Sequence, residues 1–245
     1  RWAEALNATG KPMMIENCLN KHPTFILSNP VQCPFNFYRA GPDNAPDFHG
    51  GLRKVFYWAQ PFLSTRVGGV PASRPGCFAY ADMLGIGAPI RGSAIRKEAE
   101  SRGCSNLSFQ EEQTLFANWA IVSSPLVLGY DVRNDTEVEK YWPIVTNELA
   151  LEINEAWAGE PGSLIKQSSV EFEATTNVGT ACEVQPAPRN KMPTWLVYKK
   201  KLDAFRIAAL AINLAEEHMT FQVTAEELGA EPTKGDWQAQ DVWTG

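Results

Sequence analysis

The pattern of apolar residues changes once along this chain, and the change limits the folds available to it. Over residues 1–162, short apolar runs alternate with amphipathic stretches of helical period, which is typical of parallel strands joined by crossover helices. Beyond residue 162, apolar and polar residues alternate with period two, which indicates antiparallel strands. The sequence therefore predicts an α/β domain over residues 1–162 and an antiparallel β domain, of the sandwich type, over residues 163–245.

The first domain holds four strand-helix units. Its expected strands are residues 12–16, 33–38, 76–80 and 125–128, and its expected helices are 51–63, 108–123 and 141–157. Ser108 and Glu111 form a capping-box pattern at the start of the second helix. Because a (β/α)8 barrel requires eight units in ~250 residues, we interpret the four units as the C-terminal half of a TIM barrel. Unpaired strand edges favour aggregation, so we expect a preceding segment or another chain to complete the barrel.

The second domain shows only short strand patterns. Its expected strands are residues 195–198, 205–213, 219–223 and 240–243, with a short helix at 225–229. Residues 175–193 carry no clear period and are expected to form a flexible loop.

Charge and hydropathy exclude two classes of protein. The net charge is −6 with a pI near 5.2, and the largest cationic cluster is the three lysines 199–201, so nucleic-acid binding is not expected. The longest apolar stretch, residues 117–128, is interrupted by Ser123, Ser124 and Pro125 and is shorter than the ~20 residues of a membrane span. The first residue is an arginine without a following signal core, so we expect the chain to continue a longer polypeptide.

The five cysteines favour disulfides. No Cys-x-x-Cys pair and no Cys/His spacing suited to zinc is present, so no metal site is expected. Cys18 and Cys33 lie one strand-loop unit apart, and Cys77 and Cys104 bracket a polar loop, so these are the two expected pairs. Cys182 is then left for a partner outside the chain.

Three glycosylation sequons begin at Asn7, Asn106 and Asn134, where about one is expected by chance. Together with the cysteines they indicate an oxidising compartment, either the exterior of the cell or the lumen of a lysosome or vacuole.

Two acidic residues follow predicted strands. Asp43 and Asp82 each come just after an apolar run, and Arg39 precedes Asp43 by four residues. Barrel enzymes place their chemistry at the carboxyl ends of strands, so these residues are candidates for a site. The alternatives are structural: a turn cap for Asp43, a partly buried ion pair for Arg39, a loop cap for Asp82 and core packing for Met83. A mechanism with two carboxylates also needs a nucleophile, and the chain offers no convincing one.

The histidines and tryptophans have simpler interpretations. The histidines show no spacing for a metal or a triad, and the helical tryptophans are expected in the core. Trp58 and Tyr80 are open between sugar stacking and burial. The residues concerned are His22, His49 and His218, and Trp119, Trp142 and Trp157.

Several short motifs, taken in order, resemble one family. They are Thr-Gly-Lys-Pro at 9–12, Phe-Tyr-Arg-Ala-Gly-Pro-Asp at 37–43, Ala-Tyr-Ala-Asp-Met-Leu at 79–84, and Ser-Pro-Leu-Val-Leu-Gly at 124–129. Trp-Leu-Val-Tyr-Lys at 195–199 and Gln-Asp-Val-Trp at 240–243 continue the likeness. The chain thereby resembles the C-terminal half of the α-galactosidases and α-N-acetylgalactosaminidases of glycoside hydrolase family 27.

The resemblance implies a retaining glycosidase for terminal α-linked galactose that uses no cofactor. It implies Asp43 as general acid/base, sugar contacts from Arg39, Asp82, Met83 and Cys18, and support for a Cys18–Cys33 bridge. The nucleophile of the family lies in an upstream Lys-x-Asp-x-Cys segment that this chain lacks, so the chain alone is expected to be inert. The implied partners are an α-galactoside, the N-terminal half-barrel from the same or another chain, and a homodimer or larger assembly. The alternative function is a non-catalytic structural or glycan-binding subunit.

Two departures from the family pattern leave the sugar open between galactose, N-acetylgalactosamine and others. The usual Trp-Asn-Asp-Pro-Asp-Met is Phe-Ala-Tyr-Ala-Asp-Met at 78–83, and Leu19-Asn20 stands where Glu-Trp is common.

Overall fold

A small parallel sheet carries the first half of the fold. The computed structural model describes residues 2–18, 24–44, 48–87, 107–174, 191–230 and 237–245. Strands β1 (Glu16–Asn17), β2 (Phe37–Arg39) and β5 (Phe78–Tyr80) pair in the order β1-β2-β5. Both pairings are parallel, with Phe37 opposite Glu16 on one side and Phe78 on the other. A single parallel bridge joins Leu84 to Leu128.

Three of the four predicted parallel strands exist, but they are shorter and begin later than expected. The expected strand at 12–16 shares only Glu16 with β1, because Met13 and Met14 are exposed and outside the sheet. Arg39, which lies just beyond the expected strand at 33–38, is the last residue of β2. The expected strand at 125–128 contributes only the bridge at Leu128. The apolar residues of the sequence were enough to locate these strands approximately. Where each strand begins and ends is set by its pairing with a neighbouring strand.

The helices differ from the prediction in two places. The expected helix at 51–63 is α3 (Phe48–Arg53), a π-helical segment η1 (Lys54–Ala59) and α4 (Gln60–Ser64) in succession. The expected helix at 141–157 is confirmed as helical but divided in two: α7 (Asp135–Val145) begins earlier and ends before Asn147, and α8 (Glu148–Glu155) follows. The Asn147 side chain caps α8 by accepting from the Ala150 amide at 2.8 Å. Two short helices, α1 (Trp2–Asn7) and α2 (Phe25–Ser28), lie near the start of the chain.

Helix α6 (Phe109–Ile121) confirms the predicted capping box. The Glu111 amide donates to Ser108 Oγ at 3.3 Å, and the Ser108 amide donates to Glu111 Oε2 at 2.7 Å. Trp119 of this helix is fully buried as expected, whereas Trp142 of α7 is 58% exposed and is not a core residue.

The second part of the chain is antiparallel, as predicted. Strands β6 (Ser163–Gln167), β9 (Trp195–Lys201) and β10 (Ile207–Asn213) form a sheet in the order β10-β9-β6. Strands β7 (Glu171–Glu173) and β8 (Lys191–Pro193) pair separately, and β3 (Arg66–Val67) with β4 (Val70–Pro71) forms a small ribbon earlier in the chain.

Three expectations for the second part have different outcomes. The short helix is confirmed as α9 (Ala225–Leu228), which ends at Gly229 with φ +76°. The strands expected at 219–223 and 240–243 are wrong, because neither segment pairs with a neighbour in the described structure. Most of the loop expected at 175–193 lies outside the described residues, and its last three residues are β8.

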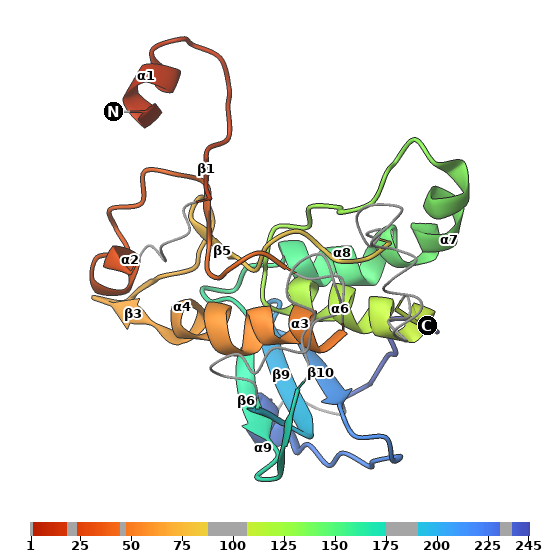
Figure 1. Ribbon diagram of the computed structural model, residues 1–245. Helices are drawn as coiled ribbons and strands as arrows, with labels where there is room; N and C mark the ends of the chain where they lie inside the picture. Colours follow the sequence, from red (N-terminus) through yellow and green to blue (C-terminus); the bar gives the residue numbers. More distant parts are fainter. Residues whose placement is uncertain (1, 19–23, 45–47, 88–106, 175–190, 231–236) are drawn as a thin grey trace.

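A layer of helices lies between the two sheets (Figure 1). Helix α6 contacts β9 and β10, and α4 contacts β6. On the other side, the ring of Tyr38 in β2 meets Phe62 of α4 edge to face, with ring centroids 5.2 Å apart. Where the chain enters β6, a Cβ atom on Gly162 would lie 1.9 Å from the carbonyl oxygen of Ile121, so this close approach requires glycine.

Lys200 ties the antiparallel sheet to the helical layer. Its side chain is buried, and its ammonium donates to the carbonyl oxygens of Ile153 and, at 2.9 Å, of Asn154 near the end of α8. These carbonyls belong to the last turn of a helix, where backbone acceptors have no partner within the helix. Burial lowers the pKa of the Lys200 ammonium to about 8. Among the described helices, none has both the length and the apolar character needed to cross a bilayer.

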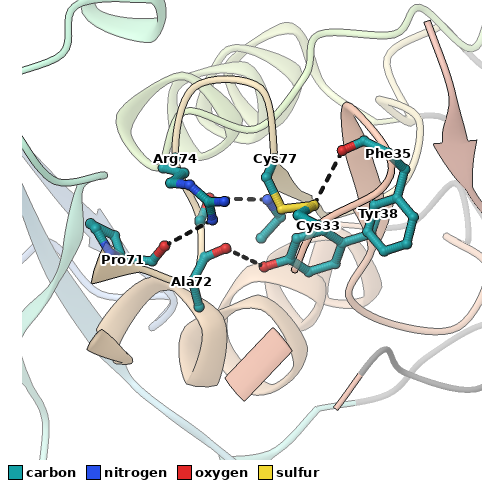
Figure 2. Close-up of a disulfide and its surroundings, with 9 residues drawn as sticks. Cys33, Phe35, Tyr38, Pro71, Ala72, Arg74 and Cys77 are labelled. Atoms are coloured by element: carbon teal, nitrogen blue, oxygen red, sulfur yellow. Dashed lines mark hydrogen bonds between the residues drawn. A yellow bond between two sulfur atoms is a disulfide. The ribbon is translucent and has the colours of Figure 1, made fainter. Parts of the chain in front are cut away.

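Cys33 and Cys77 form a disulfide, with Cα atoms 6.1 Å apart (Figure 2). Both predicted pairings, Cys18–Cys33 and Cys77–Cys104, are therefore wrong. Cys33 and Cys77 precede the adjacent parallel strands β2 and β5, so they lie at the same end of the sheet. Cys18 follows β1 at the opposite end and is a free, exposed thiol. Cys104 and Cys182 lie outside the described residues.

We predict that replacing both Cys33 and Cys77 with serine lowers the free energy of unfolding. The bridge closes a segment with a sequence separation of 44, for which the chain-entropy relation gives about 4 kcal/mol. Urea denaturation of the variant and the oxidised protein measures the difference. Peptide mapping without reduction provides the control, and a peptide that links Cys18 to Cys33 would contradict the assignment.

Candidate functional site

Arg39 joins residues that come from the carboxyl ends of three neighbouring strands. Its Nη2 atom donates to Asp43 Oδ1 at 2.8 Å and to Asp82 Oδ2 at 3.1 Å, and its Nη1 atom donates to Cys18 Sγ at 3.3 Å. Cys18 follows β1, Arg39 ends β2 and Asp82 follows β5. The structure therefore brings together four of the five predicted site residues.

The charge of Arg39 is held in place despite its burial. Its side chain is only 9% exposed. Burial disfavours the cation, but the hydrogen bonds to Cys18 and Asp43 and the charge of Asp82 outweigh it, and the pKa of Arg39 is raised above its usual value. Arg39 is therefore a permanent cation around which the acids are arranged.

The two aspartates differ in their access to solvent. The Asp43 side chain is 86% exposed, whereas that of Asp82 is 14% exposed. The same Asp82 Oδ2 that meets Arg39 also accepts from the Asn44 amide at 2.5 Å, and the Asp82 carbonyl accepts from Trp119 Nε1 at 2.8 Å. Asp82 links three segments, and Asp43 is the carboxylate that a molecule from solvent reaches.

The backbone of Asp82 is in the left-handed region, with φ +82°. This conformation costs a non-glycine residue roughly 1–2 kcal/mol, so the surrounding contacts must hold it. Asn44 supplies one of them, because its Nδ2 atom donates to the Met83 carbonyl at 2.9 Å. Met83 takes part through this backbone group, and its side chain is 40% exposed.

Three residues at the site were missed by the sequence analysis. Glu16 of β1 has a raised pKa, because desolvation and the negative charge of Asp82 outweigh the attraction of Arg39. Asn44 follows Asp43 directly, and Lys54 donates from Nζ to the Asp43 carbonyl at 2.5 Å. The strand-end position of Glu16 was a usable signal. No sequence pattern marked Lys54, because it lies outside the apolar face of its predicted helix.

The two aromatic candidates for sugar stacking are packed against the protein. Tyr80 is buried, with its ring edge to face with Phe37 at 5.3 Å between centroids. Trp58 packs on Gly41, where an added Cβ would lie 2.8 Å from Trp58 Cβ. Of the two interpretations of Tyr80, sugar stacking and burial, the structure therefore supports burial.

Of the remaining predicted residues, only some lie in the described part of the chain. Asn7 and Asn134 are exposed, while Asn106, Leu19, Asn20 and His22 lie outside the described residues. His49 lines a separate cavity of about 470 Å³, where burial lowers its pKa. In the described ranges, no group of three or more His, Cys, Asp or Glu side chains is arranged to hold a metal ion.

A search for matching family models finds none. Among curated proteins, the α-galactosidase mel1 of Schizosaccharomyces pombe is 40% identical over 63 residues, which make up 26% of this chain and 14% of that protein.

Solved structures match almost the whole chain at low identity. The α-galactosidase MEL1 of Saccharomyces cerevisiae gives a TM-score of 0.63 at 18% identity, covering 96% of this chain and 47% of that one. The structure of the S. cerevisiae enzyme with raffinose gives 0.59 at 17% identity, covering 97% and 48%. A family 27 β-L-arabinopyranosidase of Geobacillus stearothermophilus, in complex with arabinose, gives 0.65 at 18% identity, covering 93% and 44%. The chain shares its fold with these proteins and spans less than half the length of each.

We predict different effects on stability for the two aspartates. Asp82→Asn keeps the shape and tolerates the positive φ, but it removes the charge that faces buried Arg39, so we expect a loss of about 2–3 kcal/mol. Asp43→Asn should change the free energy of unfolding little, because the Asp43 carboxylate is exposed and the charge of Asp82 still faces Arg39. Urea denaturation of both variants tests this. Equal losses in the free energy of unfolding would contradict the prediction, because the two acids would then stabilise the fold equally.

Proposed function

We propose that this chain, which is related to the α-galactosidases of glycoside hydrolase family 27, is part of a retaining glycoside hydrolase that cleaves terminal α-linked galactose. Residues 1–162 contribute the C-terminal half of a (β/α)8 barrel, and residues 163–245 contribute the β domain. The observation that carries the proposal is the pairing of buried Arg39 with exposed Asp43 at the end of a parallel strand.

In this proposal Asp43 is the general acid/base. A retaining glycosidase needs a carboxylic acid that protonates the leaving oxygen and later takes a proton from water. Asp43 has the exposure to reach both, and the hydrogen bond from Arg39 sets the direction of its carboxylate. Arg39, Asp82, Met83 and Cys18 then contact the sugar. Exposed Cys18 and the partly exposed Asp82 both contact the guanidinium, and the side chain of Met83, next to Asp82 in sequence, is exposed, which supports this assignment.

The nucleophile is proposed to lie on a segment outside this chain. Asp82 is proposed as a sugar contact and not as the nucleophile, because the nucleophile of the family belongs to the upstream Lys-x-Asp-x-Cys segment. The second carboxyl group of a retaining enzyme lies ~5–5.5 Å from the acid. Strand β1 is at the edge of the described parallel sheet, so its free side is where an N-terminal half-barrel, from the same or another chain, would pair.

The proposed substrate is an α-galactoside. Raffinose, which is present in the S. cerevisiae structure, is a compound of this class. Because the G. stearothermophilus relative was solved with arabinose, related sugars remain alternative substrates in this proposal.

We also propose an oxidising location, outside the cell or in a lysosomal or vacuolar lumen. The Cys33–Cys77 disulfide fits such a compartment. Asn7 and Asn134 are exposed and accessible to a glycosylating enzyme, and Asn106 is the third proposed acceptor.

We predict that Asp43→Asn lowers hydrolysis of a nitrophenyl α-galactoside by at least ~100-fold in the protein that contains both this chain and the nucleophile segment. The melting temperature should stay close to that of the unmodified protein, because Asp43 is exposed. The chain of 245 residues alone, as a control, should be inactive. Unchanged turnover would remove Asp43 from the mechanism. Binding of raffinose without any hydrolysis would instead favour the glycan-binding subunit.

A further inference from the structure

The backbone around Asp43 must be held from within the protein, because its side chain is exposed. Asp43 lies in the turn that leaves β2, and its carboxylate contacts Arg39. One hydrogen bond from an exposed side chain is not enough to fix the backbone conformation of the turn. A general acid needs its oxygen within hydrogen-bond distance of the leaving oxygen, and a displacement of 1 Å costs on the order of 100-fold in rate.

Lys54 supports this turn from segment η1. Its Nζ atom donates to the Asp43 carbonyl oxygen at 2.5 Å, and the residue is only 8% exposed. Hydrogen bonds from charged donors are roughly twice as strong as neutral ones. Removing an ammonium from water is costly, so a buried lysine whose ammonium donates to the backbone of this turn indicates a role in holding it.

The π-helical segment η1 brings two side chains to the same turn. Lys54 is its first residue and Trp58 its fifth, and residues four apart lie on the same face of a helical turn. Trp58 packs against Gly41, and Lys54 holds the carbonyl of Asp43 two residues later. π-helical turns are less stable than α-helical ones and occur often at functional sites.

We infer that Lys54 is a positioning residue that fixes the direction of the Asp43 carboxylate for proton donation. The inference rests on the proposed function. Lys54 holds the carbonyl of Asp43, Arg39 holds its carboxylate, and Asp82 holds the amide of the next residue, Asn44. Three points of attachment define the orientation of the acid before a substrate arrives.

The test uses two substrates that differ in their need for the acid. When the glycosidic C–O bond of raffinose breaks, the departing sugar oxygen must receive the proton of Asp43. Dinitrophenolate is a stable anion, and it leaves a dinitrophenyl α-galactoside without that proton. Loss of acid positioning therefore slows only the first substrate, whereas loss of folded protein slows both equally.

Lys54→Met keeps the length of the side chain and removes the ammonium. In the protein containing this chain and the nucleophile segment, we expect kcat/KM for raffinose to fall ~10–100-fold and that for dinitrophenyl α-galactoside to fall less than ~3-fold. Asp43→Asn should show the same selectivity to a greater degree. Lys200→Met is the matched control, because this lysine is also buried and bonded to backbone carbonyls, away from the site. The control should reduce both values by one common factor, and the same behaviour in Lys54→Met would overturn the inference.

Hydrogen exchange keeps the inference testable apart from activity. Lys54→Met should speed amide exchange in peptides that cover residues 40–44, and Lys200→Met should leave it unchanged. No increase in Lys54→Met would refute the positioning role. If the unmodified protein hydrolyses neither substrate, the proposed function fails, and the exchange result still decides whether Lys54 holds the turn.

Discussion

The arrangement of the candidate site depends on one buried guanidinium. Arg39 is nearly inaccessible to water, yet it remains charged because two carboxylates and a thiol face it. A buried cation without such partners would cost several kcal/mol, so the positions of its partners are constrained. Residues at the carboxyl ends of β1, β2 and β5 therefore lie close together around Arg39. The difference between the two acids follows from this: one is fixed among backbone groups, and the other remains open to solvent.

The elements near the site were largely predictable from sequence. The four-residue spacing of Arg39 and Asp43 placed both at the end of β2, and the strand before Asp82 placed its carboxylate beside them. Parallel strands with short loops put such residues at one edge of the sheet, whatever the details of the helices. The residues that meet at that edge were therefore identifiable without coordinates, even though the strand limits were displaced by several residues.

What the sequence concealed depends on contacts between distant segments. Cysteine pairing was inferred from spacing along the chain, whereas the bond joins the residues that precede two adjacent strands. Lys54 looked like a polar residue on a helix, because nothing local shows that the helix widens there and faces the turn after β2. Trp142 was assigned to the core by its helical setting, but in α7 its ring is on the exposed side of the helix. Local patterns cannot report such features, since each is set by tertiary packing.

The disulfide has a consequence for the alignment of the sheet. A shift of one residue between β2 and β5 would turn every side chain to the opposite face. In the observed alignment Arg39 lies opposite Tyr80, two residues before Asp82. A covalent link between Cys33 and Cys77 at the beginnings of these strands opposes such sliding. The disulfide at one end of the sheet therefore helps to fix the register of β2 and β5, and with it the residues that lie opposite each other at the other end.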